Sequence, residues 1–154
     1  TNSFLYSLVM DTYSLGFNAG GYTDMPINHK IFLAQFDAIK KIANEGPCIL
    51  VGRCADYALE DYDNLLSIFV HADMDVRIRR IARIYDLTDA KAKEMIIKTD
   101  KSRSSYYNYY SNKKWGSADS YHMCLDSSVL GLRGTADAIE KLVEIKERNE
   151  DKRL

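Results

Sequence analysis

A chain of 154 residues, 46% hydrophobic and 28% charged, is long enough for one compact domain with a hydrophobic core and too short for two ordinary domains. Its 21 basic and 22 acidic side chains leave a formal charge of -1, which excludes a global polycationic surface for nucleic acid or an anionic membrane. No apolar run approaches the roughly 20 residues of a membrane-spanning helix. We therefore expect a single domain over residues 1–154 and no transmembrane segment.

The cysteines and histidines show no spacing typical of a disulfide framework or a metal site. Cys48, Cys54 and Cys124 form neither a CxxC pair nor an even set. We expect reduced, buried thiols in a cytoplasmic protein, because free cysteine behaves as a small hydrophobe. No structural metal is predicted.

In the first half of the chain, helical spacing of apolar residues predicts a helix over residues 27–44, which Gly46-Pro47 ends. Residues 48–51 (CILV) and 65–70 read as short strands buried on both faces. Residues 1–26 contain a glycine cluster and are expected to form a segment on the substrate side, without a defined place in the sheet.

In the second half, Asp73 is a candidate cap for an arginine-rich helix, and Thr88 is a candidate N-cap for a helix that extends to about residue 110. A third strand is predicted over residues 121–126 and a closing helix from about Thr135. Strands that alternate with helices predict an α/β fold with a parallel sheet flanked by helices on both faces.

Ligands of open α/β sheets bind outside the carboxyl ends of the strands. This rule points to the loops that begin at Gly52, at His71 and near Asp126. At the first loop, glycine allows a ligand to approach the backbone, and the guanidinium of Arg53 matches the geometry of phosphate oxygens. The alternative is structural: Arg53 pairs with Asp56 or another carboxylate.

Residues 77–103 carry nine lysines and arginines against four acids. A solvated helix face is the ordinary interpretation of such a run. The preference for arginine at four positions favours phosphate contacts instead, because arginine binds phosphate through two parallel hydrogen bonds. The four positions are Arg77, Arg79, Arg80 and Arg83.

Asp100 and Arg103 are three residues apart, so on a helix they share a face. The pair could bind a ribose hydroxyl and its phosphate together, or form an ordinary intrahelical ion pair. The tyrosines at 106–110, with the Lys113-Lys114-Trp115 segment, are expected to be packing residues, although such a strip also stacks single-stranded bases. The overall charge disfavours an RNA-binding role.

Neither GxxxxGK[ST] nor GxGxxG occurs in the sequence, so these residues alone do not predict ATP binding. Longer stretches nevertheless resemble the cytidylate kinase-like family of P-loop nucleoside monophosphate kinases. The resemblance spans roughly residues 27–145 and is most specific in GPCILVGRCADY (46–57), TDKSRSSYYNYYSNKKWG (99–116) and CLDSSVLG (124–131).

The resemblance implies a P-loop kinase-like three-layer sandwich that lacks its N-terminal strand, phosphate loop and helix, and it implies a chain that is a fragment of a longer protein. It implies that Gly52, Arg53 and Asp56 lie in a substrate-binding loop, with Arg53 on the monophosphate. Asp100 would meet the acceptor ribose and Arg103 its phosphate. The expected lid or phosphate-clamping cations are Arg77, Arg80 and Arg83.

The implied activity is phosphoryl transfer from ATP, with Mg²⁺, to a nucleoside monophosphate such as CMP or to a related small phosphorylated acceptor. No residue for ATP is identified, because the phosphate loop is missing. Cys54 and Ala55 separate Asp56 from the Gly-Arg pair, a departure from the usual family pattern that leaves the acceptor open. The alternatives are a non-catalytic nucleotide sensor and, with less support, an RNA-binding module.

Overall fold

The structure, a computed structural model, describes residues 27–150. These residues fall into two compact units, divided between Leu65 and Leu66. Together the described parts contain five α-helices and two β-strands, a mixed α/β arrangement. The single domain over 1–154 stays a prediction, and the proposed substrate-side segment at 1–26 lies outside the described residues.

The first unit contains α2 (Ile27–Glu45) and the short α3 (Ala55–Ala58). The predicted helix is confirmed, and it ends directly before Gly46, whose φ of 148° is a conformation that few other residues adopt. The inward side chains of α2 pack against α3 and the turn after it. The core of this unit consists of Ile39, Ala55, Ala58 and Leu59, with Phe36, Ala43, Leu50, Tyr62 and Leu65 around it.

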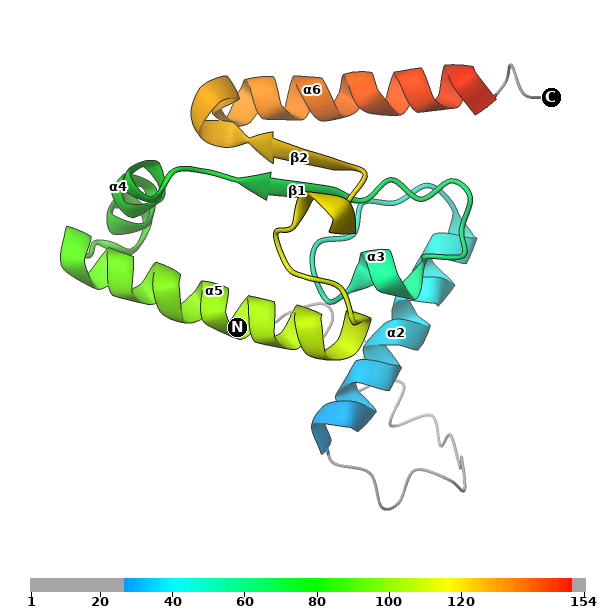
Figure 1. Cartoon of the computed structure of the whole chain (residues 1–154), viewed down its shortest axis with the longest axis horizontal. Coiled ribbons are helices and arrows are strands. Elements are labelled where there is room, and N and C mark those ends of the chain that lie inside the picture. The colour runs from blue at the N-terminus through cyan, green and yellow to red at the C-terminus, as the bar shows by residue number, and fades with distance from the viewer. Residues whose placement is uncertain (1–26, 151–154) are drawn as a thin grey trace. The chain divides into compact units, whose positions relative to one another are not determined.

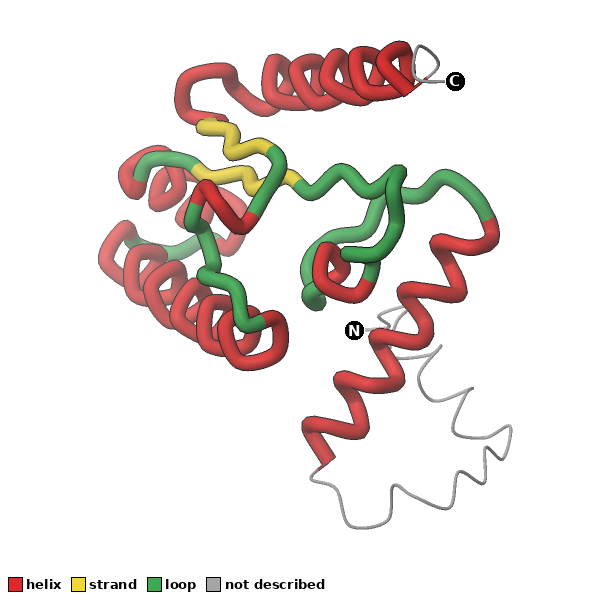
Figure 2. The backbone as a smooth tube through the Cα atoms, turned by 45° about the vertical axis from the view of Figure 1, so that its right-hand side comes forward, coloured by secondary structure: helices red, strands yellow, loops and turns green. Residues whose placement is uncertain are grey.

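The predicted strand at 48–51 is wrong. These residues are not in a strand, and Figure 2 shows the segment after α2 as a loop. Ile49 is 94% exposed and Val51 is 88% exposed, whereas Leu50 between them packs on the core of the first unit. A strand buried on both faces needs hydrogen-bonded neighbours, and within residues 27–150 this segment pairs with none.

The second unit is built on a two-stranded parallel sheet of β1 (Ile68–His71) and β2 (Met123–Asp126), shown side by side in Figure 1. Ile68 lies opposite Met123, and His71 lies opposite Asp126. Before β1, the backbone N–H of Ser67 donates to Nδ1 of His122 at 3.0 Å, which extends the pairing. The parallel sheet is therefore confirmed, but the described sheet is narrower than expected.

Between the two strands lie α4 (Met74–Tyr85) and α5 (Asp89–Ser111), which pack against each other, and the short 3-10 helix η1 (Ala118–Ser120). Thr88 caps α5 as predicted, because its hydroxyl accepts from the backbone N–H of Lys91 at 3.4 Å. Asp73 precedes α4 but forms no side-chain cap, contrary to the expectation. Its backbone N–H instead donates to Oγ of Ser128 at 2.6 Å.

The last helix, α6 (Ser127–Glu150), starts earlier than predicted and contacts both strands. It is kinked at Gly131, whose φ of 67° and ψ of 174° are not helical. Thr135 donates to the carbonyl of Gly131 at 2.6 Å, so the expected start near Thr135 falls in the first turn after the kink.

An aromatic cluster joins α5, the α5–β2 connection and β1. Phe69 of β1 contacts Trp115 edge-on with ring centres 5.2 Å apart and stacks on Tyr121 at 5.0 Å. Tyr121 in turn stacks on the buried Tyr107 of α5 at 5.8 Å. These members of the Tyr/Lys/Trp segment are packing residues, which supports the ordinary interpretation of the strip.

Within residues 27–150, no helix combines the length and hydropathy needed to cross a bilayer.

Candidate functional site

The charged residues of α4 and α5 meet at Asp100. Nη1 of Arg77, on α4, lies 2.7 Å from Oδ2 of Asp100, on α5. The Arg77 side chain is 28% exposed and that of Asp100 is 20% exposed, so this pair is largely withdrawn from water. Such a contact is stronger than an exposed ion pair, because the surrounding dielectric is lower.

A second guanidinium approaches the same carboxylate. Nη1 of Arg103 lies 3.6 Å from Oδ1 of Asp100, one helical turn along α5, and its side chain is 62% exposed. The predicted proximity of Asp100 and Arg103 is confirmed. At 3.6 Å this contact is an ion pair but not a hydrogen bond. Oδ1 is buried and has no hydrogen-bond partner within the part of the chain that the structure describes.

We call Arg77, Asp100 and Arg103 the charge triad. Two guanidinium groups and one carboxylate carry a net charge of about +1, because arginine stays protonated at all ordinary pH values. Each guanidinium has five N–H donors in a planar fork, and one nitrogen of each faces Asp100. The remaining donors suit an anion with several oxygens, such as a phosphate.

Local structure fixes the positions of the three triad residues on α4 and α5. The turn that connects the helices spans Asp86 to Thr88, and Asp86 adopts a left-handed conformation with φ of 51°. The Thr88 cap fixes where α5 begins, which determines the face that Asp100 and Arg103 occupy. The hydrogen bond from the backbone of Asp73 to Ser128 ties the start of α4 to the first turn of α6. The short turn and these two hydrogen bonds thus determine where Arg77 and Asp100 lie.

The other predicted cations of α4 do not join the triad. Arg80 is half-buried and Arg83 is exposed, and neither forms an ion pair within residues 27–150. Their expected role as clamping residues stays a prediction.

The predicted substrate loop of the first unit is a tight left-handed turn. Gly52, Arg53 and Cys54 have φ values of 75°, 57° and 55°. The backbone N–H of Ala55 donates to the carbonyl of Gly52 at 3.1 Å and closes the turn before α3. Left-handed conformations are costly for residues with a Cβ and persist where the surrounding structure imposes them.

This turn exposes Arg53 and buries Cys54. Arg53 forms no ion pair with any described residue, so the structural alternative in which it pairs with Asp56 is not observed. Asp56 is half-buried in α3. Burial, together with the nearby Asp56, raises the pKa of the Cys54 thiol to about 11, so this thiol is a packing group and not a nucleophile.

All three cysteines are free thiols, but their burial differs from the expectation. Cys54 is buried and Cys124 is half-buried, whereas Cys48 is exposed. Cys48 lies in the segment that was expected to be a buried strand, so the same missing strand neighbours account for its exposure.

Two of the three predicted loops meet at the carboxyl edge of the sheet. His71 and Asp126 are paired in register, and Oγ of Ser127 donates to the carbonyl of His71 at 2.9 Å. The backbone N–H of Ser128 donates to Oδ1 of Asp126 at 2.8 Å, and this bond is the main reason that the pKa of Asp126 lies below its ordinary value. The two serines connect the strands to α6, a role that sequence spacing did not indicate.

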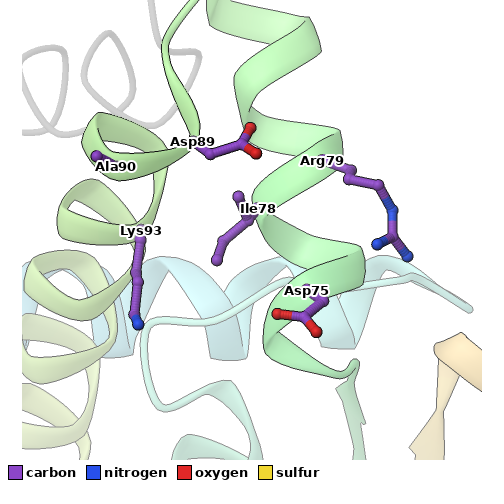
Figure 3. A pocket seen from close by; sticks show the side chains of 6 residues that line it. All are labelled: Asp75, Ile78, Arg79, Asp89, Ala90 and Lys93. Atoms are coloured by element: carbon purple, nitrogen blue, oxygen red, sulfur yellow. The ribbon is translucent and has the colours of Figure 1, made fainter.

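A shallow depression of about 280 Å³ lies between α4 and α5 (Figure 3). Its charged side chains balance, with two carboxylates and two cations, and the picture shows Arg79 directed away from Ile78 and Asp89. Of the arginines whose pattern favoured phosphate contacts, only Arg79 lines it, and no member of the charge triad does. The lining residues are Asp75, Ile78, Arg79, Asp89, Ala90 and Lys93.

The contact between Arg77 and Asp100 was missed by sequence reasoning, which assigned Arg77 to a lid. The available signal was the short connection between the two predicted helices. Helices joined by two to five residues pack as a hairpin, so residues at similar distances from the turn lie beside each other. The distances of Arg77 and Asp100 from the turn differ by only about one helical turn, so the two residues are expected to lie close together.

A family model and a curated relative both place this chain in one family. The model of the cytidylate kinase-like family matches residues 1–129. A cytidylate kinase of Methanococcus vannielii is 30% identical over 121 residues, which cover 77% of this chain and 67% of that protein. The crystal structure of an uncharacterized protein from Eubacterium ventriosum superposes with a TM-score of 0.73 at 31% identity, covering 77% of this chain and 74% of the other. The chain, with its parallel α/β core and its arginine–aspartate–arginine triad, belongs to the cytidylate kinase-like family.

Proposed function

We propose that this protein transfers a phosphoryl group from ATP to a nucleoside monophosphate, with CMP as the first acceptor to test. The observation that carries the proposal is the charge triad, in which two arginines from different helices share one carboxylate and retain a positive charge. Membership of the cytidylate kinase-like family and the similarity to a protein named cytidylate kinase support it. The parallel pairing of β1 and β2 supports our further proposal of a P-loop kinase-like sandwich.

In this mechanism the chain's own residues bind and orient the acceptor. Arg103 is the most exposed member of the triad and presents its outer N–H donors to the acceptor phosphate. Arg80 and Arg83 stabilise negative charge that develops during transfer. Phosphoryl transfer depends mainly on alignment and charge neutralisation, so fixed guanidinium groups are the contribution it requires.

Arg53 is proposed as a further contact to the acceptor monophosphate. Its exposure, its left-handed backbone and the absence of an ion pair to any described residue support a ligand-binding role over a structural one. Gly52 before it leaves the backbone accessible, since a Cβ built there would meet no atom within 4 Å.

The described residues do not fit the donor phosphates of ATP or a Mg²⁺ ion. The sequence contains no GxxxxGK[ST] motif. Within residues 27–150, no three His, Cys, Asp or Glu side chains gather in a way that would hold a metal ion. The mechanism therefore uses the arginines and Asp100 alone and assigns no residue of this chain to the donor.

The test is a kinase assay on the full-length protein with ATP, Mg²⁺ and a panel of nucleoside monophosphates. Formation of ADP together with the matching nucleoside diphosphate is the expected result. Arg103→Gln should lower kcat/KM at least tenfold, whereas Lys101→Gln, an exposed neighbour on the same helix, should change it less than twofold. No ADP above background with any acceptor would refute the proposal, and nucleotide binding without turnover would identify a non-catalytic sensor.

A further inference from the structure

We propose that the C-terminal end of α5 is a binding surface for single-stranded RNA, separate from the charge triad. The surface is built on Tyr106, Tyr109 and Tyr110, which we call the tyrosine trio, with exposed lysines on either side of it. This inference goes beyond the proposed function, because the phosphoryl-transfer mechanism uses none of these tyrosines.

The tyrosines of α5 divide into a packed residue and an exposed group. Tyr107 is buried in the aromatic cluster, whereas Tyr109 is 74% exposed and Tyr106 and Tyr110 are half-buried. The ring of Tyr110 has its centre 4.8 Å from that of Tyr106 and 4.8 Å from that of Tyr109. The contact between Tyr109 and Tyr110 is edge-on, so most of the Tyr109 ring stays open to solvent. Packing on β1 therefore does not account for the trio.

Local hydrogen bonds fix the backbone that carries these rings. The buried hydroxyl of Ser111 donates to the carbonyl of Tyr107 at 2.6 Å and accepts from the backbone N–H of Lys113 at 3.2 Å. The backbone N–H of Trp115 donates to Oδ1 of Asn108 at 2.7 Å, which holds the segment after α5 against the last turns of the helix. Since the backbone is ordered before a ligand arrives, less entropy is lost when a base stacks on the rings.

The segment that carries the trio is basic, although the whole chain has a formal charge of -1. Along α5, Lys98 precedes Tyr109 by about three turns, so both residues lie on the same exposed face, about 16 Å apart along the helix axis. Lys114 is exposed just after the end of the helix. Residues 101–118 contain no acidic residue and four cations, which are Lys101, Arg103, Lys113 and Lys114. This local charge is complementary to a polyanion.

Open aromatic rings beside cations are the two features with which proteins hold single-stranded nucleic acid. Every base has a face that stacks on an aromatic ring, and lysines neutralise the phosphates. A duplex keeps its bases stacked on each other, and an acidic peptide uses the charge but not the ring faces. The hydroxyl of Tyr109 can donate to or accept from a 2′-hydroxyl, which favours RNA over DNA.

The experiment measures the binding of a fluorescein-labelled single-stranded RNA of about 12 nucleotides, a usual site size for one domain, by fluorescence anisotropy on the full-length protein. Tyr109→Leu removes the most exposed ring of the trio. Tyr85→Leu makes the same change at a 57% exposed position of α4 and is the matched control. Lys114→Gln removes a cation near the trio, and Lys41→Gln, at an exposed position of α2, is its control. Thermal melts check that all variants are folded.

The surface predicts that Tyr109→Leu weakens RNA binding at least fivefold, whereas Tyr85→Leu changes it less than twofold. Tyr109→Phe keeps the ring and should retain most of the affinity, but it should reduce the preference for RNA over DNA of the same sequence. The logarithm of the binding constant should fall linearly with the logarithm of the salt concentration. Lys114→Gln should make this slope shallower by about 0.7, the share of one phosphate on a single strand, and Lys41→Gln should leave it unchanged.

Four results would overturn the inference. They are a wild-type protein that binds no RNA, DNA that binds as tightly as RNA, polyglutamate that binds as tightly as RNA, and RNA binding that Tyr109→Leu leaves unchanged but excess CMP abolishes. In the last case the strand would occupy the acceptor site and not the trio. The proposed function is tested separately by the kinase assay, so either proposal can fail while the other stands.

Discussion

Replacing Arg77 with methionine tests the half-buried ion pair between α4 and α5. Methionine keeps most of the aliphatic stem and removes the guanidinium that lies 2.7 Å from Asp100. Two unit charges at about 4 Å attract by about 4 kcal/mol at an effective dielectric constant of 20, and the loss of hydration offsets a large part of this. Exposed pairs contribute about 0–1 kcal/mol, whereas breaking a buried pair costs about 3–5 kcal/mol.

The exposures of 28% and 20% place this pair between those limits, so we expect a loss of about 2 kcal/mol in the free energy of unfolding. For a chain of this length that corresponds to a fall of roughly 4–8 °C in Tm. Urea denaturation and a thermal melt measure both quantities. Arg79→Met, at an exposed position of α4, is the control and should change the unfolding free energy by less than about 0.5 kcal/mol. Equal melting temperatures for the two variants would refute the reasoning.

Three further predictions concern other parts of the chain. Arg53→Ala should weaken CMP binding at least fivefold with a Tm within about 2 °C of wild type, since the side chain is exposed; a large fall in Tm with unchanged affinity would contradict this. Gly116→Ala should lower stability by about 1–3 kcal/mol in urea denaturation, because φ is 75° and the new Cβ would lie 3.3 Å from the Phe69 ring; a neutral effect would show that the aromatic cluster adapts. With iodoacetamide at pH 8, mass spectrometry should find Cys48 modified first, because Cys54 is buried and its pKa of about 11 leaves about one thiolate in a thousand; equal labelling rates would argue against this burial.

The helices were the most predictable part of the fold, because their boundaries depend on local chemistry. Gly46-Pro47 ends α2, and the Thr88 hydroxyl begins α5, and both effects act within a few residues. Asp73 was placed correctly before α4, but its side chain forms no cap, and its backbone N–H donates to Ser128 in a distant part of the chain. Such a partner cannot be inferred from local spacing.

The strands were less predictable, because a strand exists only with a partner. Residues 65–70 and 121–126 were expected to be strands; β1 overlaps the first range and ends one residue beyond it, and β2 lies within the second. Residues 48–51 have the same apolar composition, yet Ile49 and Val51 face solvent and form no ladder with any described strand. The amino-acid composition of a segment indicates its tendency to adopt an extended conformation, but it does not indicate whether a neighbouring strand is present to pair with it.

For the candidate site, the sequence predicted one contact of Asp100 and missed the other. The spacing of Asp100 and Arg103 placed them on one face of α5, and the structure confirms this. The contact of Asp100 with Arg77 joins two helices, and a contact of that kind depends on the packing angle as well as on sequence distance.

The three-residue turn from Asp86 to Thr88 has a mechanical consequence for the triad. So short a connection leaves α4 and α5 little freedom to separate, and the ion pair between the first turn of α4 and the middle of α5 joins the two helices a second time. If α4 and α5 move when a ligand binds, they move together. The distance between the guanidinium groups of Arg77 and Arg103 is then already set when they contact the ligand. The entropy of bringing them together is then lost during folding and not at each encounter with substrate.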